Sequence, residues 1–298
     1  MEICVFYVER KRQSVCHNAL VDGVDRMGKV IFLDMDGTLV DLRQRMYPGT
    51  WYALQRARAN GHKIVLCTAR AYTGIYPWLM RMSFDAVVAS SGAYVRCGDE
   101  VVAHHMLDQE KVRGLTEMLW QQGAATLVQG LYAGYAISGH KEKILDFFRH
   151  RNLDGDRILN RVTVVENPSG KAALENVLYF TEKEGFREIL QKIPERSDGY
   201  FHVMPADFGS TLNHSGIIGR SSITKASAME ELLDYWKIPF GNSMAVGDGA
   251  DDFDMIRYAA VSIVMGNGIP ELKDLADYVT DSVEEGGVAN AFRDFGLI

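Results

Sequence analysis

The stretch VIFLDMDGT, residues 30–38, decides how the rest of this chain is interpreted. Its first four residues are all apolar, which is typical of a strand buried on both faces. Residues 51–60 follow with apolar side chains three positions apart and with Gly61 at the expected helix end, and residues 64–67 are a second apolar run. Strand, helix and strand in this order predict a βαβ unit, and therefore a parallel sheet covered by helices.

The same pattern returns near the end of the chain. Residues 229–236 place apolar side chains on one face of a helix, and residues 243–246 and 261–265 are two further apolar runs. Between the two parts, shorter strands and helices alternate, and one of the expected helices covers residues 186–193 and ends at Pro194. This change of character indicates an α+β module inserted into a sheet domain.

The predicted fold class is therefore α/β, a Rossmann-like parallel sheet core with an inserted α+β domain. We expect the core to consist of residues 27–106 and 215–298, and the insertion to consist of residues 107–214. Residues 1–26 show neither a helical nor a strand period, so we expect them to be an extension outside the fold.

Composition and charge narrow the function classes. The chain has 298 residues, of which 47% are hydrophobic and 24% charged, which is ordinary globular usage. No apolar run approaches the ~18 residues of a membrane span, and no secretory signal pattern opens the sequence. The net charge of −7 comes without a basic stripe, which argues against a nucleic-acid partner. Four cysteines without a CxxC pair fit reduced thiols, so we expect a cytoplasmic protein.

Carboxylates gather after two of the predicted strands. Asp34 and Asp36 follow the first strand, and Asp248, Asp251 and Asp252 follow a later one. An Asp-Gly turn or a helix N-cap explains one acid of each group but not the whole set. Ligands of open parallel sheets bind beyond the carboxyl ends of the strands. If both groups face one crevice, their repulsion calls for a divalent cation, and oxygen ligands favour Mg²⁺.

An anionic ligand would suit such a site. Thr68 and Ala69 follow the strand at residues 64–67, where a hydroxyl and backbone N–H groups can bind a phosphate, although a threonine there is usually just a cap. Lys225 stands at the start of the helix that contains residues 229–236, where a cation opposes the helix dipole. Such a lysine either points to solvent or binds an anion.

Other catalytic motifs are absent from the sequence. It contains no P-loop, no GxGxxG at the first βα turn, no HExxH and no GxSxG. His104 and His105 are adjacent, so they lie on opposite faces of a strand, and we expect them to be surface residues rather than metal ligands.

Four motifs in this order resemble those of the haloacid dehalogenase-like superfamily: residues 34–38 (DMDGT), Thr68, Lys225 and residues 247–252 (GDGADD). The long insertion between the second and third motifs resembles the Cof-like branch, class IIB, whose α/β cap domain lies at that place. The stretch SSGA, residues 90–93, is similar to the Asn-Gly-Ala turn of the branch. The resemblance covers residues 28–298.

The resemblance implies hydrolysis of a phosphomonoester through an aspartyl-phosphate intermediate. Asp34 would attack phosphorus, and Asp36 would protonate the leaving oxygen and then activate the water. The phosphate-binding residues that the resemblance implies are Thr68, Ala69, Lys225 and Asp251. The Mg²⁺ ligands that it implies are Asp34, Asp36 through its carbonyl, Asp248, and Asp252 through water.

The resemblance leaves several functions open. It favours a small phosphorylated metabolite, above all a sugar phosphate, with pyridoxal phosphate or flavin mononucleotide as alternatives. A phosphomutase of the same superfamily is one alternative activity. Asp251 stands where the branch usually has Asn, so a phosphate- and metal-binding sensor with weakened turnover is another. Candidate cap contacts to the substrate are Tyr132, Tyr135, Asn167, His202 and Asn213. The oligomeric state is open.

Overall fold

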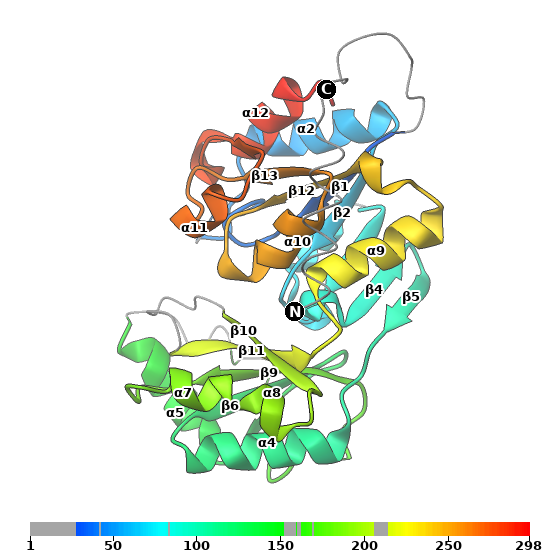
Figure 1. The fold of residues 1–298 in the computed structure, drawn as a ribbon. Coiled ribbons are helices and arrows are strands. Elements are labelled where there is room, and N and C mark those ends of the chain that lie inside the picture. The colour runs from blue at the N-terminus through cyan, green and yellow to red at the C-terminus, as the bar shows by residue number, and fades with distance from the viewer. Residues whose placement is uncertain are drawn as a thin grey trace.

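The computed structural model describes residues 28–41, 43–82, 84–151, 159, 162–168, 170–205 and 214–298. Two β-sheets, of eight and six strands, organise these residues. Figure 1 shows the two sheets as separate layers of one molecule, which we call the core sheet and the cap sheet. The predicted extension, residues 1–26, lies outside the described residues.

The core sheet has the strand order β14-β13-β12-β1-β2-β3-β4-β5. Its strands are β1 (Val30–Leu33), β2 (Lys63–Cys67), β3 (Ala86–Ala89), β4 (Tyr94–Cys97), β5 (Glu100–His104), β12 (Ser243–Gly247), β13 (Val261–Val264) and β14 (Tyr278–Val279). All pairs from β14 to β3 are parallel, whereas β3, β4 and β5 pair antiparallel. Because β1 lies between β2 and β12, the residues that follow these three strands emerge side by side at one edge of the sheet.

Helices cover both faces of the core sheet (Figure 1). One face packs against α2 (Pro48–Ala59), α3 (Pro77–Met80) and α12 (Gly287–Asp294), and the other against α9 (Lys225–Trp236), α10 (Phe253–Tyr258) and α11 (Pro270–Lys273). In β1, Ile31 and Leu33 pack on the first face and Val30 and Phe32 on the second. All four are fully buried, which confirms the prediction of a strand covered on both sides.

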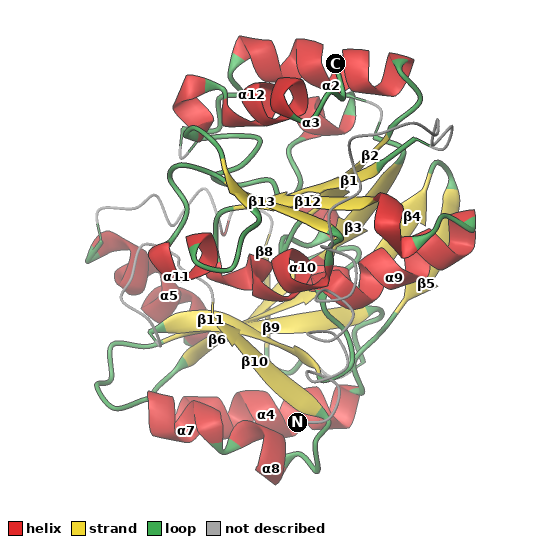
Figure 2. Ribbon diagram, turned by 45° about the horizontal axis from the view of Figure 1, so that its top comes forward, coloured by secondary structure: helices red, strands yellow, loops and turns green. Residues whose placement is uncertain are grey.

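The cap sheet has the order β10-β11-β9-β6-β7-β8. Its strands are β6 (Ala125–Gly130), β7 (Gly134–Ile137), β8 (Val162–Val165), β9 (Leu174–Phe180), β10 (Phe201–Pro205) and β11 (Ser215–Arg220). Helices α4 (Gln109–Gln121), α7 (Arg187–Gln191) and α8 (Ile193–Arg196) pack on one face, and α5 (His140–Arg149) packs on the other. In Figure 2 the cap strands lie between α4, α7 and α8 on one side and the core on the other.

The chain enters the cap after β5 and returns to the core through α9. The α/β core with an inserted α+β cap is the fold class that the sequence predicts. The boundaries at residues 107 and 214 stay predictions, and the cap strand β11 lies beyond the second of them, because it pairs with β9 and β10 of the cap sheet.

Two helices differ from their predicted extent. Helix α2 begins at Pro48 rather than at residue 51, because a proline fits the first helical turn, where no N–H partner is needed. The helix predicted over residues 186–193 consists of α7 and α8 instead. Pro194 lies in the first turn of α8 for the same reason, so it begins a helix where the sequence predicted an end.

None of the helices in the described part of the chain is long and apolar enough to span a membrane.

Candidate active site

Asp34 and Lys225 form the centre of the site. Asp34 lies directly after β1 and is buried, and its Oδ1 lies 2.7 Å from Lys225 Nζ. The same ammonium lies 2.6 Å from Asp252 Oδ1 and 2.7 Å from Asp251 Oδ2. Lys225 is only 1% exposed. Lys225 therefore does not point to solvent, and its partners in this structure are carboxylates of the protein itself.

The start of α9 holds Lys225 in place. Thr224 is the N-cap of this helix and forms a capping box with Ser227, whose Oγ accepts the Thr224 N–H at 3.0 Å. Gly92, in the loop after β3, has φ +105° and lies against the same residue. A Cβ at Gly92 would lie 2.2 Å from the Thr224 carbonyl oxygen, so only glycine allows this close approach.

Asp252 connects Lys225 to the loop after β12. Its Oδ2 accepts the N–H groups of Asp248 and Gly249 at 2.8 and 3.0 Å, while its Oδ1 faces Lys225. One oxygen of Asp252 therefore caps the backbone, as a carboxylate at a helix start is expected to do, and the other oxygen belongs to the charged cluster.

Asp248 is held by two side chains. Thr38 Oγ1 donates to Asp248 Oδ1 at 2.8 Å, and Asn267 Nδ2 lies 3.4 Å from Oδ2. Gly37, with φ +89°, packs directly on this carboxylate, because a Cβ there would lie 2.0 Å from Asp248 Oδ2. The loops after β1 and β12 thus meet at the sheet edge, where the sequence predicted that their acids converge.

Burial and mutual repulsion shift the protonation of the cluster. Burial raises the pKa of Asp34 well above its usual value, which Lys225 opposes and the neighbouring aspartates reinforce. Burial, with the charge of Asp252, raises the pKa of Asp248 to about 8. Burial also raises the pKa of Asp252. For Lys225, burial acts to lower the pKa, but Asp251, Asp252 and Asp34 together raise it, so the ammonium stays charged.

The cluster suits a divalent cation. Asp34, Asp248 and Asp252 each offer a carboxylate oxygen, and these oxygens lie within 4.8 Å of one another. Burial is the main reason why the pKa values of Asp34, Asp248 and Asp252 rise, and the charges of the neighbouring aspartates add to it, although Lys225 opposes it. A set of hard oxygen donors suits a hard divalent cation, which these residues would hold directly or through water.

Asp36 lies outside this cluster. Its side chain is 40% exposed and accepts two bonds from Arg70, from Nε at 2.6 Å and from a terminal nitrogen at 3.0 Å. The sequence predicted that strand alternation would bring Asp34 and Asp36 together. Instead, β1 ends at Leu33, and the N–H groups of Leu39 and Val40 turn back to the Met35 carbonyl oxygen. The period of two therefore does not continue as far as Asp36.

Thr68 and Ala69 form the neighbouring loop after β2. Thr68 is buried, its Oγ1 accepts the Arg70 N–H at 3.2 Å, and its carbonyl accepts the Ser91 N–H at 3.1 Å. Ala69 packs against the apolar cluster of the cap that contains Leu178. This loop therefore lies where the core meets the cap.

Residues 31–292 match the model of the haloacid dehalogenase-like hydrolases. The chain belongs to this family. Phosphatase YwpJ of Bacillus subtilis (strain 168) is 25% identical to this chain, over 89% of this chain and 99% of that protein. The 5-amino-6-(5-phospho-D-ribitylamino)uracil phosphatase YitU of the same strain is also 25% identical, over 89% of this chain and 97% of that protein.

A solved structure shares the whole architecture. The HAD subclass IIB sugar phosphatase BT4131 superimposes with a TM-score of 0.75 at 25% identity, over 91% of this chain and 100% of that one. Because the chain belongs to a family of hydrolases and its relatives are named phosphatases, it is a phosphatase enzyme. The family match and the likeness to BT4131 confirm the resemblance to the Cof-like branch, class IIB, that the sequence indicated.

Four residues of this hydrolase site were not singled out from the sequence: Thr38, Arg70, Tyr76 and Asn267. Thr38 belongs to the first motif, and Arg70 follows Thr68 by two positions, so both lie in or beside the motifs that the sequence offers. Asn267 follows β13, the next parallel strand along the same sheet edge, which is the signal that could have identified it. Tyr76 accepts from Arg70 at 2.9 Å and has no comparable signal in the sequence.

The residues of the cap that were candidates for contact with the substrate lie in different parts of the cap. His202 lies on β10, on the same face of the sheet as Met204, whose cluster packs against Ala69 of the core. Tyr135 packs with the cluster on the outer face, so its prediction as a substrate contact is wrong, because the sheet stands between it and the core. Tyr132 is 71% exposed in the loop after β6, Asn167 follows β8, and Asn213 lies outside the described residues.

His104 and His105 are not the surface residues that the sequence predicted. His104 Nε2 lies 3.0 Å from Glu175 Oε1 of the cap, and His105 Nε2 lies 2.7 Å from Glu231 Oε1 of α9. Both imidazoles are mostly buried, with 19% and 25% of the side chain exposed. The hairpin of β4 and β5 packs under the cap and α9, which covers residues that an isolated hairpin would expose.

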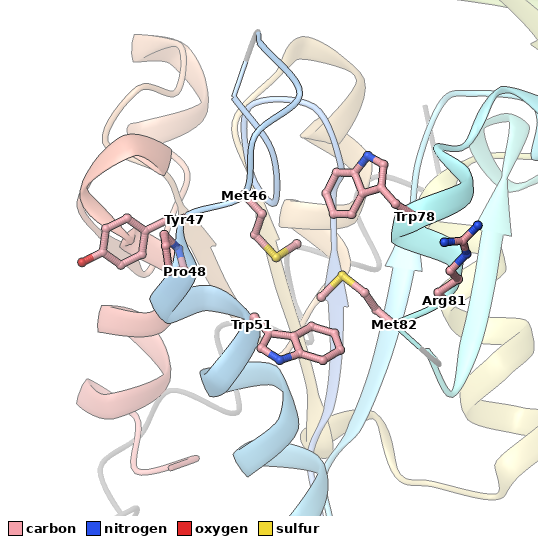
Figure 3. Close-up of a pocket in the computed structure, with 7 residues that line it drawn as sticks. All are labelled: Met46, Tyr47, Pro48, Trp51, Trp78, Arg81 and Met82. Carbon is pink, nitrogen blue, oxygen red and sulfur yellow. The ribbon is translucent and has the colours of Figure 1, made fainter.

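A groove of about 310 Å³ lies elsewhere, between α2 and α3 (Figure 3). Trp51, Trp78, Met46 and Met82 line it, and its walls are mainly apolar. None of the charged cluster lines this groove, so it has no part in the chemistry argued below.

Proposed function

We propose that this protein is a Mg²⁺-dependent phosphatase that transfers the phosphoryl group of a small phosphorylated metabolite to Asp34 and then to water. The observation that supports this most is the buried contact of Asp34 with Lys225 and Asp252, beside Asp248. BT4131 is named a sugar phosphatase, which favours a sugar phosphate as substrate. We propose the cytoplasm as its compartment.

Asp34 is the nucleophile in this proposal. The ammonium of Lys225 engages Oδ1, and we assign the attack on phosphorus to Oδ2. Phosphoryl transfer needs positioning and charge stabilisation more than covalent assistance from the protein. Lys225 supplies both, because it holds the carboxylate and carries the positive charge that the transferring group requires. Thr68 and the backbone of Ala69 would bind phosphoryl oxygens beside it.

Asp36 is the acid and base of the proposal. It would protonate the leaving oxygen and then remove a proton from the water that attacks the aspartyl-phosphate. Because both carboxylate oxygens of Asp36 accept bonds from Arg70, it must part from Arg70 to reach the substrate. Arg70 would thus hold Asp36 at the edge of the site until a substrate binds.

The metal ligands in the proposal are Asp34, Asp248 and the carbonyl of Asp36, with Asp252 acting through water. Bound Mg²⁺ would neutralise negative charge on the phosphoryl group as it transfers. Thr38 and Asn267 would orient the Asp248 carboxylate for this role, because both bind it in the structure.

Phosphate release from p-nitrophenyl phosphate with Mg²⁺ tests the proposal, with Asp34→Asn as the control. Wild-type hydrolysis that Asp34→Asn abolishes supports a phosphatase that uses Asp34. Equal activity of the two proteins contradicts it. Movement of the phosphate from one position of a sugar phosphate to another, without release into solution, would indicate the phosphomutase instead.

One observation favours the sensor as a second candidate. Asp251 Oδ2 lies 2.7 Å from Lys225 Nζ, so it occupies a position on the ammonium that a phosphate would otherwise use. Tight binding of inorganic phosphate with Mg²⁺, without hydrolysis of any phosphomonoester, would support the sensor.

A further inference from the structure

Glu175, on β9 of the cap, is a buried carboxyl whose two oxygens are both bound to the core. The residue is 1% exposed. Its Oε2 accepts a bond from Ser90 Oγ at 2.5 Å, and its Oε1 lies 3.0 Å from His104 Nε2. Ser90 follows β3 and His104 ends β5, so one side chain of the cap binds two segments of the core. Burying a carboxyl is costly unless it is hydrogen-bonded, and here the core supplies the partners.

A bulge in β9 brings Glu175 to the core. Residue 175 is an extra residue in the ladder between β6 and β9, because Gln129 pairs with Asn176 whereas Gly130 pairs with Leu174. Alternation along the rest of β9 would place residue 175 on the outer face of the cap sheet, which packs against α4 and α7. A bulge redirects a side chain, so the contact of Glu175 with Ser90 depends on this irregularity of the strand.

The segment that Glu175 binds has an unusual backbone. Ser90, Ser91 and Gly92 have φ values of +51°, +55° and +105°, so three successive residues lie in the left-handed region. Two of them carry a Cβ, which makes this region unfavourable, and such a conformation persists only where the surrounding structure holds it. The bond of Ser90 to Glu175 is one of the contacts that hold this segment.

Residues 90–92 in turn hold the loop after β2. The Ser91 N–H donates to the Thr68 carbonyl oxygen at 3.1 Å, and the Ser90 N–H donates to the Arg70 carbonyl oxygen at 2.7 Å. We place Thr68 at the phosphoryl group, and Arg70 binds the carboxylate of Asp36. A shift of residues 90–92 would therefore move groups on which the proposed chemistry depends.

The same segment also holds the start of α9. Gly92 lies so close to Thr224 that a Cβ at Gly92 would be 2.2 Å from the Thr224 carbonyl oxygen. Thr224 is the N-cap of α9, and Lys225 is the first residue of this helix. The place of Lys225 therefore depends on that of residues 90–92. Through this segment, Glu175 of the cap is connected to both the phosphate-binding loop and the catalytic ammonium.

We propose that Glu175 is a positioning residue for phosphoryl transfer, which holds residues 90–92 through Ser90 and thereby places Thr68 and Lys225 at the phosphoryl group. This inference rests on the proposed function and adds a residue of the cap to it. Glu175 itself does not touch the substrate in this proposal. It acts on the placement of groups that do, and a displacement of about 1 Å can lower the rate by about 10²-fold.

A bond that only attaches the cap to the core would behave differently. Breaking it would lower the melting temperature but leave the kcat of the folded enzyme unchanged. A neighbouring pair provides the comparison, because His105 Nε2 lies 2.7 Å from Glu231 Oε1 of α9. This pair begins at the residue after His104, and its carboxylate binds none of residues 90–92 in the described structure.

The test measures steady-state hydrolysis of p-nitrophenyl phosphate by variants of the Glu175–Ser90 pair. We expect Glu175→Leu and Ser90→Ala each to lower kcat by about tenfold to a hundredfold. We expect KM to change by less than about threefold, because the displaced groups act mainly on charge that develops in the transition state. Glu175→Gln keeps an acceptor for Ser90 Oγ, so its kcat should stay within about threefold of the wild type.

A double variant and a matched control separate positioning from damage to the fold. Glu175→Leu with Ser90→Ala should be no slower than the slower single variant, because both changes remove the same interaction. Glu231→Gln should leave kcat within about twofold of the wild type, whatever its melting temperature. All assays are run below the melting temperature of each variant, and Ser90→Ala decides the result if Glu175→Leu does not fold.

The outcomes separate this inference from the proposed function. If the wild type does not hydrolyse the ester, or if Asp34→Asn is equally active, the proposed function fails and this inference fails with it. If Asp34→Asn abolishes hydrolysis but Ser90→Ala keeps the kcat of the wild type, only this inference is overturned. Additive losses in the double variant, or an equal loss in Glu231→Gln, overturn it as well.

Discussion

The edge of the core sheet and the facing side of the cap sheet are both buried and polar, but in different ways. At the core edge, Lys225 makes close ion pairs with three aspartates, and each acid has a charged or backbone partner. On the cap, Asn176 and Gln129 are uncharged and leave amide atoms without partners. The acids of the core edge are therefore paired through Lys225 and the backbone, whereas these amide atoms of the cap face have no hydrogen-bond partner in the described structure.

The difference is one between charges that are held in place by close ion pairs and uncharged polar groups that are buried without partners. Charge stabilisation requires groups held in place before the substrate arrives, and the ion pairs of Lys225 achieve that. Buried polar atoms without a hydrogen bond lower stability instead. The predictions below test each half of this comparison, from the largest expected effect to the smallest.

Asp34→Asn should cause the largest loss of catalytic activity. Removing the nucleophile should lower kcat by on the order of 10⁴-fold or more. The melting temperature should not fall, because the amide removes one charge from a crowded set of acids. Phosphate release and thermal melting check the two parts. Residual activity within tenfold of the wild type would show that the core edge does not carry the chemistry.

Asp36→Asn should separate the two chemical steps. With p-nitrophenyl phosphate, whose leaving group needs no acid, the first step should survive, while hydrolysis of the aspartyl-phosphate should slow by about 10²- to 10⁴-fold. Rapid-mixing measurements should therefore show a burst of p-nitrophenolate equal to the enzyme concentration. Steady turnover without a burst would assign the acid and base role to another residue.

Glu175→Gln should remove a pH dependence of the unfolding free energy, which arises where the cap sheet meets the core sheet. Burial raises the pKa of Glu175 from its ordinary 4.5 to about 7, which the bond from Ser90 opposes, and His104 is the other group that faces it. Because the pKa of Glu175 is higher in the folded state, the stability that its protonated carboxyl contributes is fully present below pH 4.5. This stability is lost as the pH rises through 7.

The wild type should then lose up to about 3 kcal/mol of unfolding free energy between pH 4.5 and pH 8, relative to Glu175→Gln. Denaturant unfolding at several pH values measures this difference. Glu182→Gln is a suitable comparison, because Arg151 lowers the pKa of that exposed carboxyl. Parallel stability curves for wild type and Glu175→Gln would contradict the assignment.

Mg²⁺ should stabilise the protein through the core edge. A concentration of 100 times its Kd should add about 2.7 kcal/mol to the unfolding free energy, and EDTA should reverse the effect. Asp248→Asn should abolish the stabilisation while the protein stays folded. Thermal melting with and without Mg²⁺ makes the comparison, and equal melting temperatures for the wild type would argue against a metal at this cluster.

Asp251→Asn should have the smallest effect of these changes, and it should improve substrate binding rather than impair the enzyme. Asp251 competes with a phosphate for Lys225, so its neutral replacement should lower KM for a phosphomonoester by roughly threefold to tenfold. Steady-state kinetics with p-nitrophenyl phosphate tests this. An increase in KM would show that Asp251 assists binding of the phosphoryl group.

Local patterns were sufficient for much of the fold and for part of the site. The apolar run of β1 and the helix periods of α2 and α9 predicted the parallel core, and the acids after β1 and β12 predicted the convergence of Asp34 with Asp248 and Asp252. These predictions succeeded because parallel strands expose their carboxyl ends at one edge. The convergence of Asp36 did not follow, because the strand period ends with the strand.

Other features depend on contacts between distant segments. Whether Lys225 is exposed or buried cannot be inferred from its position in a helix, since it depends on Asp34, 191 residues away, and on Asp252. His104 seemed an exposed hairpin residue because the covering Glu175 belongs to another domain. Tyr135 illustrates the same limit, because residue type alone does not say which face of the sheet it occupies.

By itself, the sequence determined the strand and helix order, the position of the inserted cap and the acids at the strand ends. These follow from side-chain periodicity and from short turns, which act over a few residues. The tertiary structure alone decided that Lys225 is shared among three aspartates, that Arg70 holds Asp36 away from them, and that Asn176 is buried without a partner. Such pairings depend on how two separately formed sheets pack together, and packing over long separations leaves no periodic signal in the chain.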